Sequence, residues 1–253
     1  MEDRDLHPRL ASLAVALVLA LVYALGARLD ERGEAAGLWR RRRWISLAAG
    51  VSVAYVFVDV LPELGVRHRR FLETAGEGLL FAEQRIYMLA LLAFVVLYGL
   101  EYMVLTSREG RASGGESHRG DAVFWLHLGG FALYSWLIGY LLVERAETGS
   151  LALSLYGFAM AFHFFLVGHS LRETHGEAFD RRGRWVLAAS VLAGWLAGVT
   201  VELSEIVLAR LFAVLAGGVV ITSLNAELPR EREGRFWYFC LGAVAYAALL
   251  ILT

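Results

Sequence analysis

Apolar and polar residues alternate in long blocks along the whole chain. Each apolar block holds about 17–23 residues, the length at which an α-helix crosses the hydrocarbon core of a bilayer. Eight such blocks predict eight transmembrane helices, over residues 10–27, 44–66, 86–106, 121–143, 151–171, 184–201, 205–228 and 236–252. Only the short turn TVELSE separates the sixth block from the seventh, so seven spans are the alternative. The pattern predicts an all-α integral membrane protein with a single polytopic domain over residues 1–253.

Composition strengthens the membrane assignment and removes some functions. The chain has 253 residues, of which 58% are hydrophobic and 19% charged, against about a quarter charged in soluble domains. All 24 basic residues are arginine, which excludes chemistry that needs a lysine, such as a retinal Schiff base. The single cysteine, Cys240, cannot form an intramolecular disulfide. We expect the lipid bilayer as a partner, and no nucleic acid.

Arginine is distributed unevenly between the two sides of the predicted helices. The loops after the first, third, fifth and seventh spans hold 16 arginines, whereas the opposite side holds 8. The densest cluster is RRRRW at residues 40–44. Because arginine-rich loops stay in the cytoplasm, we expect both termini on the outer side of the membrane. We expect this membrane to be the cell (inner) membrane.

Two distant stretches share one pattern of small residues and proline. Residues 48–64 read AAGVSVAYVFVDVLPEL, and residues 216–231 read AGGVVITSLNAELPRE. Gly50 precedes Pro62 by twelve positions, as Gly217 precedes Pro229. In the predicted topology the two stretches run in opposite directions. Two inverted three-helix units (about 10–106 and 184–252) then flank central helices at 121–171, an architecture that recurs in transporters.

This 3+2+3 arrangement resembles the ZIP family of zinc and iron transporters. The second and seventh spans of that family each carry a stretch that AAGVSVAYVFVDVLPE of this chain resembles. The segment VLAASVLAGWLAGV of this chain is similar to the sixth span of the family. The resemblance implies a membrane transporter of divalent metal ions, with zinc as substrate, and is compatible with a homodimer. The family's metal motifs, H-N-x-P-E-G and H-E-x-P-E-G, are reduced here to HLGGFA at His127 and HFFLVG at His163. The expected metal site is therefore degenerate.

Three histidines and one aspartate are the candidate metal ligands. From their positions in the spans, we expect His127 and His163 about 9 and 12 Å above the same cytoplasmic boundary, on adjacent helices. Imidazole suits zinc, and ionisable groups inside a membrane are functional candidates. Asp59 lies three residues before Pro62, where the ZIP-like pattern has a polar ligand. His169, at the cytoplasmic mouth, is either a weak release site or part of a solvated helix end.

Three further polar residues mark the expected path of the ion. Glu101, near the inner end of its span, is placed to reach toward His127 or to snorkel to the interface. Asn225 and Glu227, near the cytoplasmic end of the seventh span, either form a gate opposite Asp59 or snorkel. The sequence leaves open the metal, the direction of transport and the driving force.

Three other functions stay open. The missing carboxylates favour a ZIP-like protein that no longer transports and acts as a sensor or a structural partner. Haem binding needs only two axial ligands, for which His127 and His163 are candidates. An intramembrane metal hydrolase is disfavoured, because no HExxH or HxxxH spacing puts two ligands on one helix face. We therefore predict no enzyme.

Overall fold

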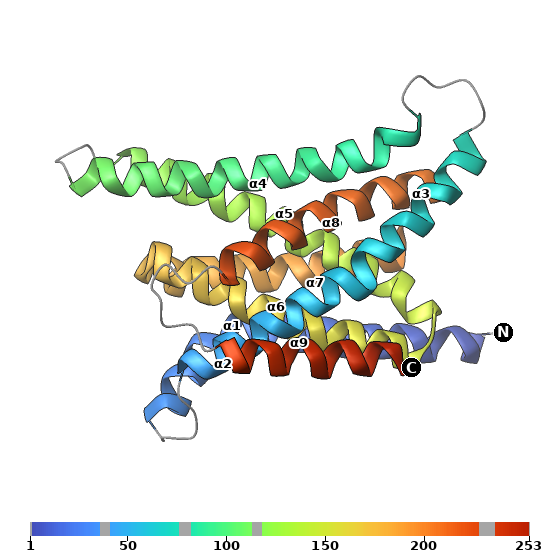
Figure 1. Cartoon of the computed structure of the whole chain (residues 1–253), viewed down its shortest axis with the longest axis horizontal. Coiled ribbons are helices and arrows are strands. Elements are labelled where there is room, and N and C mark those ends of the chain that lie inside the picture. The colour runs from blue at the N-terminus through green and yellow to red at the C-terminus, as the bar shows by residue number, and fades with distance from the viewer. Residues whose placement is uncertain (1, 36–40, 76–81, 113–117, 228–235, 253) are drawn as a thin grey trace.

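Helices make up most of the computed structural model, which describes residues 2–35, 41–75, 82–112, 118–227 and 236–252 (Figure 1). Side chains are described for residues 7–26, 43–72, 84–106, 121–223 and 236–252. The helices are α1 (Glu2–Ala35), α2 (Arg41–Tyr55), α3 (Leu61–Ala75), α4 (Ala82–Ala112), α5 (His118–Glu147), α6 (Ser150–His175), α7 (Arg184–Thr200), α8 (Glu205–Glu227) and α9 (Phe236–Ile251). The chain also contains two π-helical turns: η1 (Val56–Val60) lies between α2 and α3, and η2 (Phe179–Gly183) lies before α7.

Most of these helices have the length and composition of membrane spans. Across the described ranges, seven segments are long and apolar enough to cross a membrane: His7–Gly26, Arg43–Leu72, Gln84–Thr106, Asp121–Glu147, Ser150–His175, Phe179–Thr200 and Glu205–Ser223. Phe236–Ile251 is a shorter apolar helix. The prediction of an all-helical, multi-pass membrane protein is confirmed at this level. The predicted break at TVELSE is also present, since α7 ends at Thr200 and α8 begins at Glu205.

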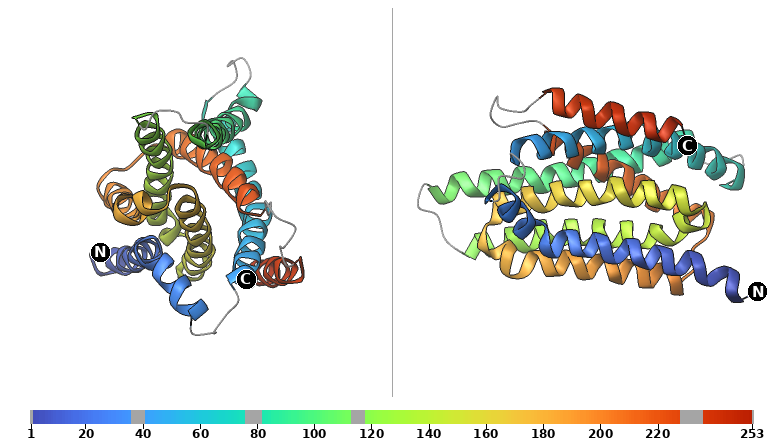
Figure 2. Two further views of the ribbon diagram at one scale, coloured as in Figure 1. Left: turned by 90° about the vertical axis from the view of Figure 1, so that its left-hand side faces the viewer. Right: turned by 90° about the horizontal axis from the view of Figure 1, so that it is seen from below.

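Successive helices run in alternating directions along the bundle, and both chain ends lie at the same end of it. The N-terminus, the C-terminus and the turn between α5 and α6 lie at this end, which we call the terminal end (Figures 1 and 2). The turn between α6 and η2 lies at the other end, which we call the opposite end (Figure 1). Gly149 precedes α6 with φ 131°, and Gly176 follows it with φ 55°. Glycine adopts these backbone angles without strain, so both ends of α6 are fixed by glycine.

The helices pack as two groups. Group A contains α1, α5, α6 and α7, and group B contains α2 with α3, α4, α8 and α9. Figure 2 (left) views the bundle from one end, with α1 of group A and α9 of group B on opposite flanks. Within group A, a Cβ on Gly139 or Gly194 would fall within 3.0 Å of a carbonyl oxygen on the facing helix, so α5 and α7 touch backbone to backbone.

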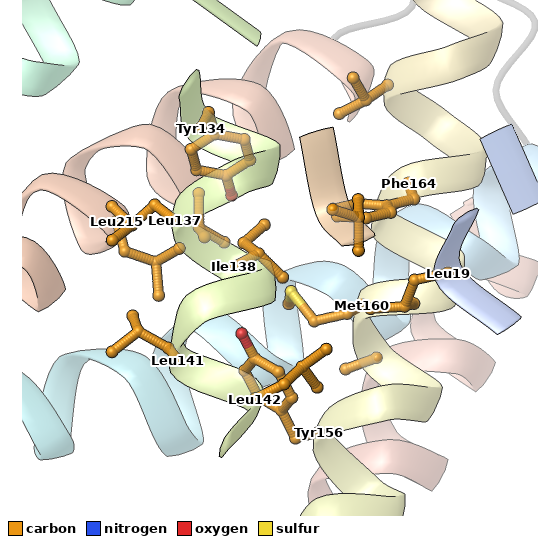
Figure 3. Packing of buried hydrophobic residues seen from close by; sticks show 14 of the residues in the cluster. Leu19, Tyr134, Leu137, Ile138, Leu141, Leu142, Tyr156, Met160, Phe164 and Leu215 are labelled. Carbon is orange, nitrogen blue, oxygen red and sulfur yellow. The ribbon is translucent and has the colours of Figure 1, made fainter. Parts of the chain in front are cut away.

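Buried apolar side chains of α5, α6 and α1 meet in the core of the bundle. Ile138 and Leu142 of α5 lie close to Met160 and Phe164 of α6, and Leu19 of α1 packs beside them (Figure 3). All five side chains are almost completely buried. In a membrane such contacts stabilise the bundle through close packing, because the lipid is as apolar as the core itself.

Two glycines of the repeated pattern bring the helices of group B together. A Cβ on Gly50 in α2 would fall within 3.0 Å of the Phe239 carbonyl oxygen in α9. A Cβ on Gly217 in α8 would fall within 3.0 Å of the Ala90 carbonyl oxygen in α4. The two copies of the pattern therefore have the same structural task, which is a close helix–helix contact inside group B.

Pro62 of the pattern acts on the helix that precedes it. Pro62 has no N–H, so the Val58 carbonyl lacks its α-helical donor. Just before it, the Leu61 N–H donates to the Val56 carbonyl, five residues back, and forms the π-helical turn η1. Asp59 lies in this widened turn. The counterpart, Pro229, lies outside the described residues.

Candidate functional site

His163 is the centre of a buried polar cluster between the two helix groups. Its imidazole, on α6, is 1% exposed. Nδ1 lies 3.2 Å from Ser52 Oγ, and Nε2 lies 3.1 Å from the Tyr134 hydroxyl and 3.2 Å from Thr222 Oγ1. Ser52 Oγ lies 2.8 Å from Ser223 Oγ. Helices α2, α5, α6 and α8 each contribute to this cluster, and both imidazole nitrogens have partners.

The hydroxyl of Thr222 indicates where the proton of His163 lies. Thr222 Oγ1 donates its only proton to the carbonyl of Gly218, at 2.8 Å. Its oxygen is therefore left to accept a hydrogen bond from Nε2–H of His163, and Nδ1 then accepts one from the Ser52 hydroxyl. With Nε2 protonated, the only lone pair of the ring is on Nδ1, and it accepts the hydrogen bond from Ser52 and does not face an empty ligand position.

His127 lies in a second buried cluster, toward the opposite end of the bundle. Its side chain, on α5, is 1% exposed. Nδ1 lies 2.8 Å from Nε2 of His175 on α6, and Nε2 lies 3.4 Å from Oε1 of Glu101 on α4. The contact with Glu101 is too long for a well-formed hydrogen bond, so His127 Nε2 is a buried atom without a hydrogen-bond partner. Of the two placements expected for Glu101, the structure has the one that reaches His127.

The geometry of this second cluster suits a small cation. A metal ion bound to both Nε2 and Oε1 at about 2.0–2.1 Å would see the two atoms at an angle of about 110°, close to tetrahedral. Binding requires a free lone pair on Nε2, so the proton of His127 must lie on Nδ1 and be donated to His175. A histidine ligand is commonly held by such an outer hydrogen bond, which fixes its tautomer and ring orientation.

Asp59 is ion-paired. Its Oδ2 accepts a hydrogen bond from Arg145 Nη2 at 2.7 Å, which joins η1 of group B to the end of α5 in group A. About two turns further along, Arg67 donates to Glu63 at 2.9 Å and to Glu144 at 2.6 Å. Arg67 is only 6% exposed. The orientation argument treated Arg67 and Arg145 as loop residues, whereas the structure places both in ion pairs inside the bundle.

The remaining sequence candidates are less informative. His169 Nε2 lies 3.3 Å from Glu173 Oε1, one helical turn away on α6. The side chains of Asn225 and Glu227 lie outside the described residues, so their proposed part in the path stays a prediction.

The structure assigns the two predicted histidines to separate clusters. None of the hydrogen bonds described for His127 or His163 joins one ring to the other. Sequence reasoning also missed the hydroxyl partners. Ser52 and Thr222 lie inside the repeated Gly–Pro stretches, so small polar residues in those stretches were a usable signal.

Comparison with known proteins adds no family. No family model, curated protein or solved structure matches this chain. Among the side chains that the structure describes, no three His, Cys, Asp or Glu residues are arranged to hold one metal ion. Any cation at Glu101 and His127 would therefore have two protein ligands, with water or an unassigned group completing its shell.

Proposed function

We propose that this chain transports a divalent cation, with zinc as the representative substrate, across a membrane. The observation that carries the proposal is the buried, unpartnered Nε2 of His127 beside the Glu101 carboxylate, held in orientation by His175. Two protein ligands bind more weakly than the four of a structural zinc site. An ion that must leave again needs such an exchangeable site, so the small ligand set suits transport better than storage.

The polar contacts between the two helix groups suit a path with gates. They occur at three levels: the Asp59–Arg145 pair toward the terminal end, the His163 cluster in the middle, and Glu101–His127 toward the opposite end. Each joins a side chain of group A to one of group B. If the groups move relative to one another, these contacts break and re-form, and they are therefore the candidates for gates.

The packing of group B supports the inverted-repeat, ZIP-like arrangement as part of the proposal. In an inverted repeat the second span corresponds to the seventh, and the third span corresponds to the eighth. The contact between spans two and eight, which is α2–α9, then corresponds to the contact between spans seven and three, which is α8–α4. Both pairs exist, and each has a glycine at its closest contact, Gly50 in one and Gly217 in the other. We further propose that both termini lie outside and that the arginine-rich opposite end faces the cytoplasm.

Among the alternatives, haem binding has the weaker support. An axial ligand needs a free imidazole nitrogen, and both nitrogens of His163 have hydrogen-bond partners in the protein. A non-transporting sensor or structural protein shares the same fold and differs only in flux. The decision between that alternative and a transporter is therefore made by experiment.

The test is zinc uptake by liposomes that contain the full-length protein and a trapped zinc indicator. We expect saturable uptake by the wild type, and a decrease of at least tenfold in Glu101→Gln and in His127→Gln. His175→Phe, which removes the outer hydrogen bond to His127, is expected to weaken zinc binding by about 10–100-fold. Glu173→Gln is the matched control, because Glu173 lies near the same end of the bundle and is exposed.

Two results would contradict the proposal. Wild-type protein that binds no zinc, iron or manganese and shows no flux would leave the non-transporting alternative. Uptake that is the same in Glu101→Gln as in Glu173→Gln would show that the Glu101–His127 pair is not on the path. The amount of folded protein in each liposome sample is checked by size-exclusion chromatography before reconstitution.

A further inference from the structure

A cavity of about 470 Å³ lies at the terminal end of the bundle, where Asp59 and Arg145 meet. Its walls come from α2 and η1, the end of α5, the start of α6 and the end of α9. The α5–α6 turn that forms part of the wall is at the terminal end in Figure 2 (right). Sites for small organic molecules commonly enclose about 300–1,000 Å³, so the cavity is large enough for a ligand.

Arg145 supplies hydrogen-bond donors to this cavity. A guanidinium has five N–H donors, and a single hydrogen bond, to Asp59 Oδ2 at 2.7 Å, is described for Arg145. Its Cζ also lies 5.7 Å from the centre of the Tyr156 ring. Most of the donor capacity of Arg145 is therefore available to a bound oxyanion.

The start of α6 supplies more donors on the same side. Gly149 is the N-cap and carries no side chain that could cap the helix. The first hydrogen bond of α6 runs from Leu153 N–H to the Gly149 carbonyl, so the N–H groups of Ser150, Leu151 and Ala152 have no acceptor within the helix. Residues 149–152 all line the cavity. A helix N-terminus carries a partial positive charge and binds oxyanions.

Asp59 and two tyrosines complete the polar lining. Tyr55 and Tyr156 are 1% and 3% exposed. The Tyr55 hydroxyl faces the Asp59 carboxylate from the preceding turn, and the Tyr156 hydroxyl has no hydrogen-bond partner. Buried polar groups in native proteins nearly always have partners. The unpartnered hydroxyl of Tyr156 beside the Asp59–Arg145 ion pair indicates that the protein alone does not satisfy this region. Leu155 and Leu250 add apolar wall.

We propose that this cavity binds a zwitterion, a molecule with an oxyanion and an ammonium group a few bonds apart and an apolar part beside them. The oxyanion accepts hydrogen bonds from Arg145 and from the N-terminus of α6. The ammonium group binds the Asp59 carboxylate. The ligand thereby replaces one internal ion pair with two, and its apolar part contacts Leu155 and Leu250. This site shares no residue with the Glu101–His127 pair and does not rest on cation transport.

Two sources supply this chemistry, a free amino acid and the headgroup of an aminophospholipid. The experiment titrates full-length protein in detergent with L-leucine or phosphatidylethanolamine and counts bound ligand by native mass spectrometry. Each has a partner without the ammonium group, 4-methylpentanoate for leucine and phosphatidylglycerol for the lipid. We expect one zwitterion to bind at least tenfold more tightly than its partner without the ammonium group. If leucine shows this difference, the ligand is a free amino acid; if phosphatidylethanolamine shows it, the cavity is a lipid site.

Variants connect the binding to the proposed residues. Asp59→Asn and Arg145→Gln are each expected to weaken binding at least tenfold, whereas Arg181→Gln, in an exposed ion pair with Glu177, leaves it unchanged. The reversed pair, Asp59→Arg with Arg145→Asp, keeps an ion pair for folding but sets a carboxylate against the N-terminus of α6. It is expected to lose binding.

Three results would overturn the proposal. One is equal binding of each zwitterion and its partner without the ammonium group, and another is no binding of either zwitterion by the wild type. The third is wild-type affinity in the reversed pair.

Discussion

Replacement of Gly50 or Gly217 by alanine tests the equivalence of the two helix pairs in group B. At each position the new Cβ would lie within 3.0 Å of a backbone carbonyl oxygen, of Phe239 in α9 or of Ala90 in α4. Backbone atoms cannot rotate out of the way as side chains can. Because non-bonded carbon atoms pack at about 3.5–4.0 Å, each facing helix must move away by about 1 Å.

The size of the effect follows from two opposing contributions. Overpacking of a well-packed contact costs about 1–3 kcal/mol. Alanine in place of a helical glycine returns about 0.5–1 kcal/mol through its higher helix propensity. Each variant should therefore lose about 0.5–2 kcal/mol of stability. For a chain of this size, that loss corresponds to a decrease in Tm of about 1–8 °C.

The assay is thermal unfolding of purified protein in one detergent, followed by tryptophan fluorescence. Gly129→Ala is the control, because a Cβ there meets nothing within 4 Å and the alanine should leave Tm unchanged or raise it. If Gly50→Ala and Gly217→Ala behave like Gly129→Ala, the close contacts are refuted. If only one of the two lowers Tm, the equivalence of the two helix pairs is refuted.

Three further predictions concern buried polar groups, and all are measured as changes in unfolding free energy in the same detergent. Ser52→Ala leaves Nδ1 of His163 without its donor and should cost about 1–3 kcal/mol; no change would contradict the assigned cluster. Arg67→Met leaves two glutamates without their shared cation and should cost about 1.5–3 kcal/mol, part of which is recovered when one glutamate is changed to glutamine. Tyr246→Phe loses a hydrogen bond to a backbone carbonyl and should cost about 1 kcal/mol, whereas Tyr156→Phe loses none and should stay within about 0.5 kcal/mol; equal losses would contradict this difference.

The helices could be predicted from the sequence because their main determinant is local. An apolar block of sufficient length must be helical in a bilayer, since no water is present to satisfy its backbone. The predicted span 205–228 differs from α8, Glu205–Glu227, by one residue. A larger difference is found at the second span, predicted as 44–66, which continues through α3 to Ala75. There the apolar block ends but the helix does not, because Arg67 finds two glutamates as partners.

The contents of the candidate site could be predicted only in part. Position within a span gives depth, and on that basis His127 and His163 were expected together. Depth does not say toward which neighbouring helix a side chain turns, and each ring has partners on different helices. For Glu101 the sequence left two placements open, toward His127 or snorkelling to the interface, and the structure has the first, since both residues lie near the same end of adjacent spans. His175 was not singled out from the sequence, because nothing local indicates its contact with His127.

Charged residues inside the bundle show why the partners cannot be found by local reasoning. Asp59 and Arg145 are 86 positions apart in the chain, and Arg67 and Glu144 are 77 apart. Taken singly, each charge is costly in a membrane. The sequence therefore placed Arg67, Glu144 and Arg145 outside the spans, and it interpreted Asp59 as a metal ligand. Taken in pairs, the same charges fix how group A and group B are aligned, since a shift of one helical turn, about 5.4 Å, exceeds the reach of an ion pair. Any relative movement of the two groups must therefore break Asp59–Arg145 and Arg67–Glu144 together, and that coupling makes these pairs candidates for the gate as well as for the scaffold.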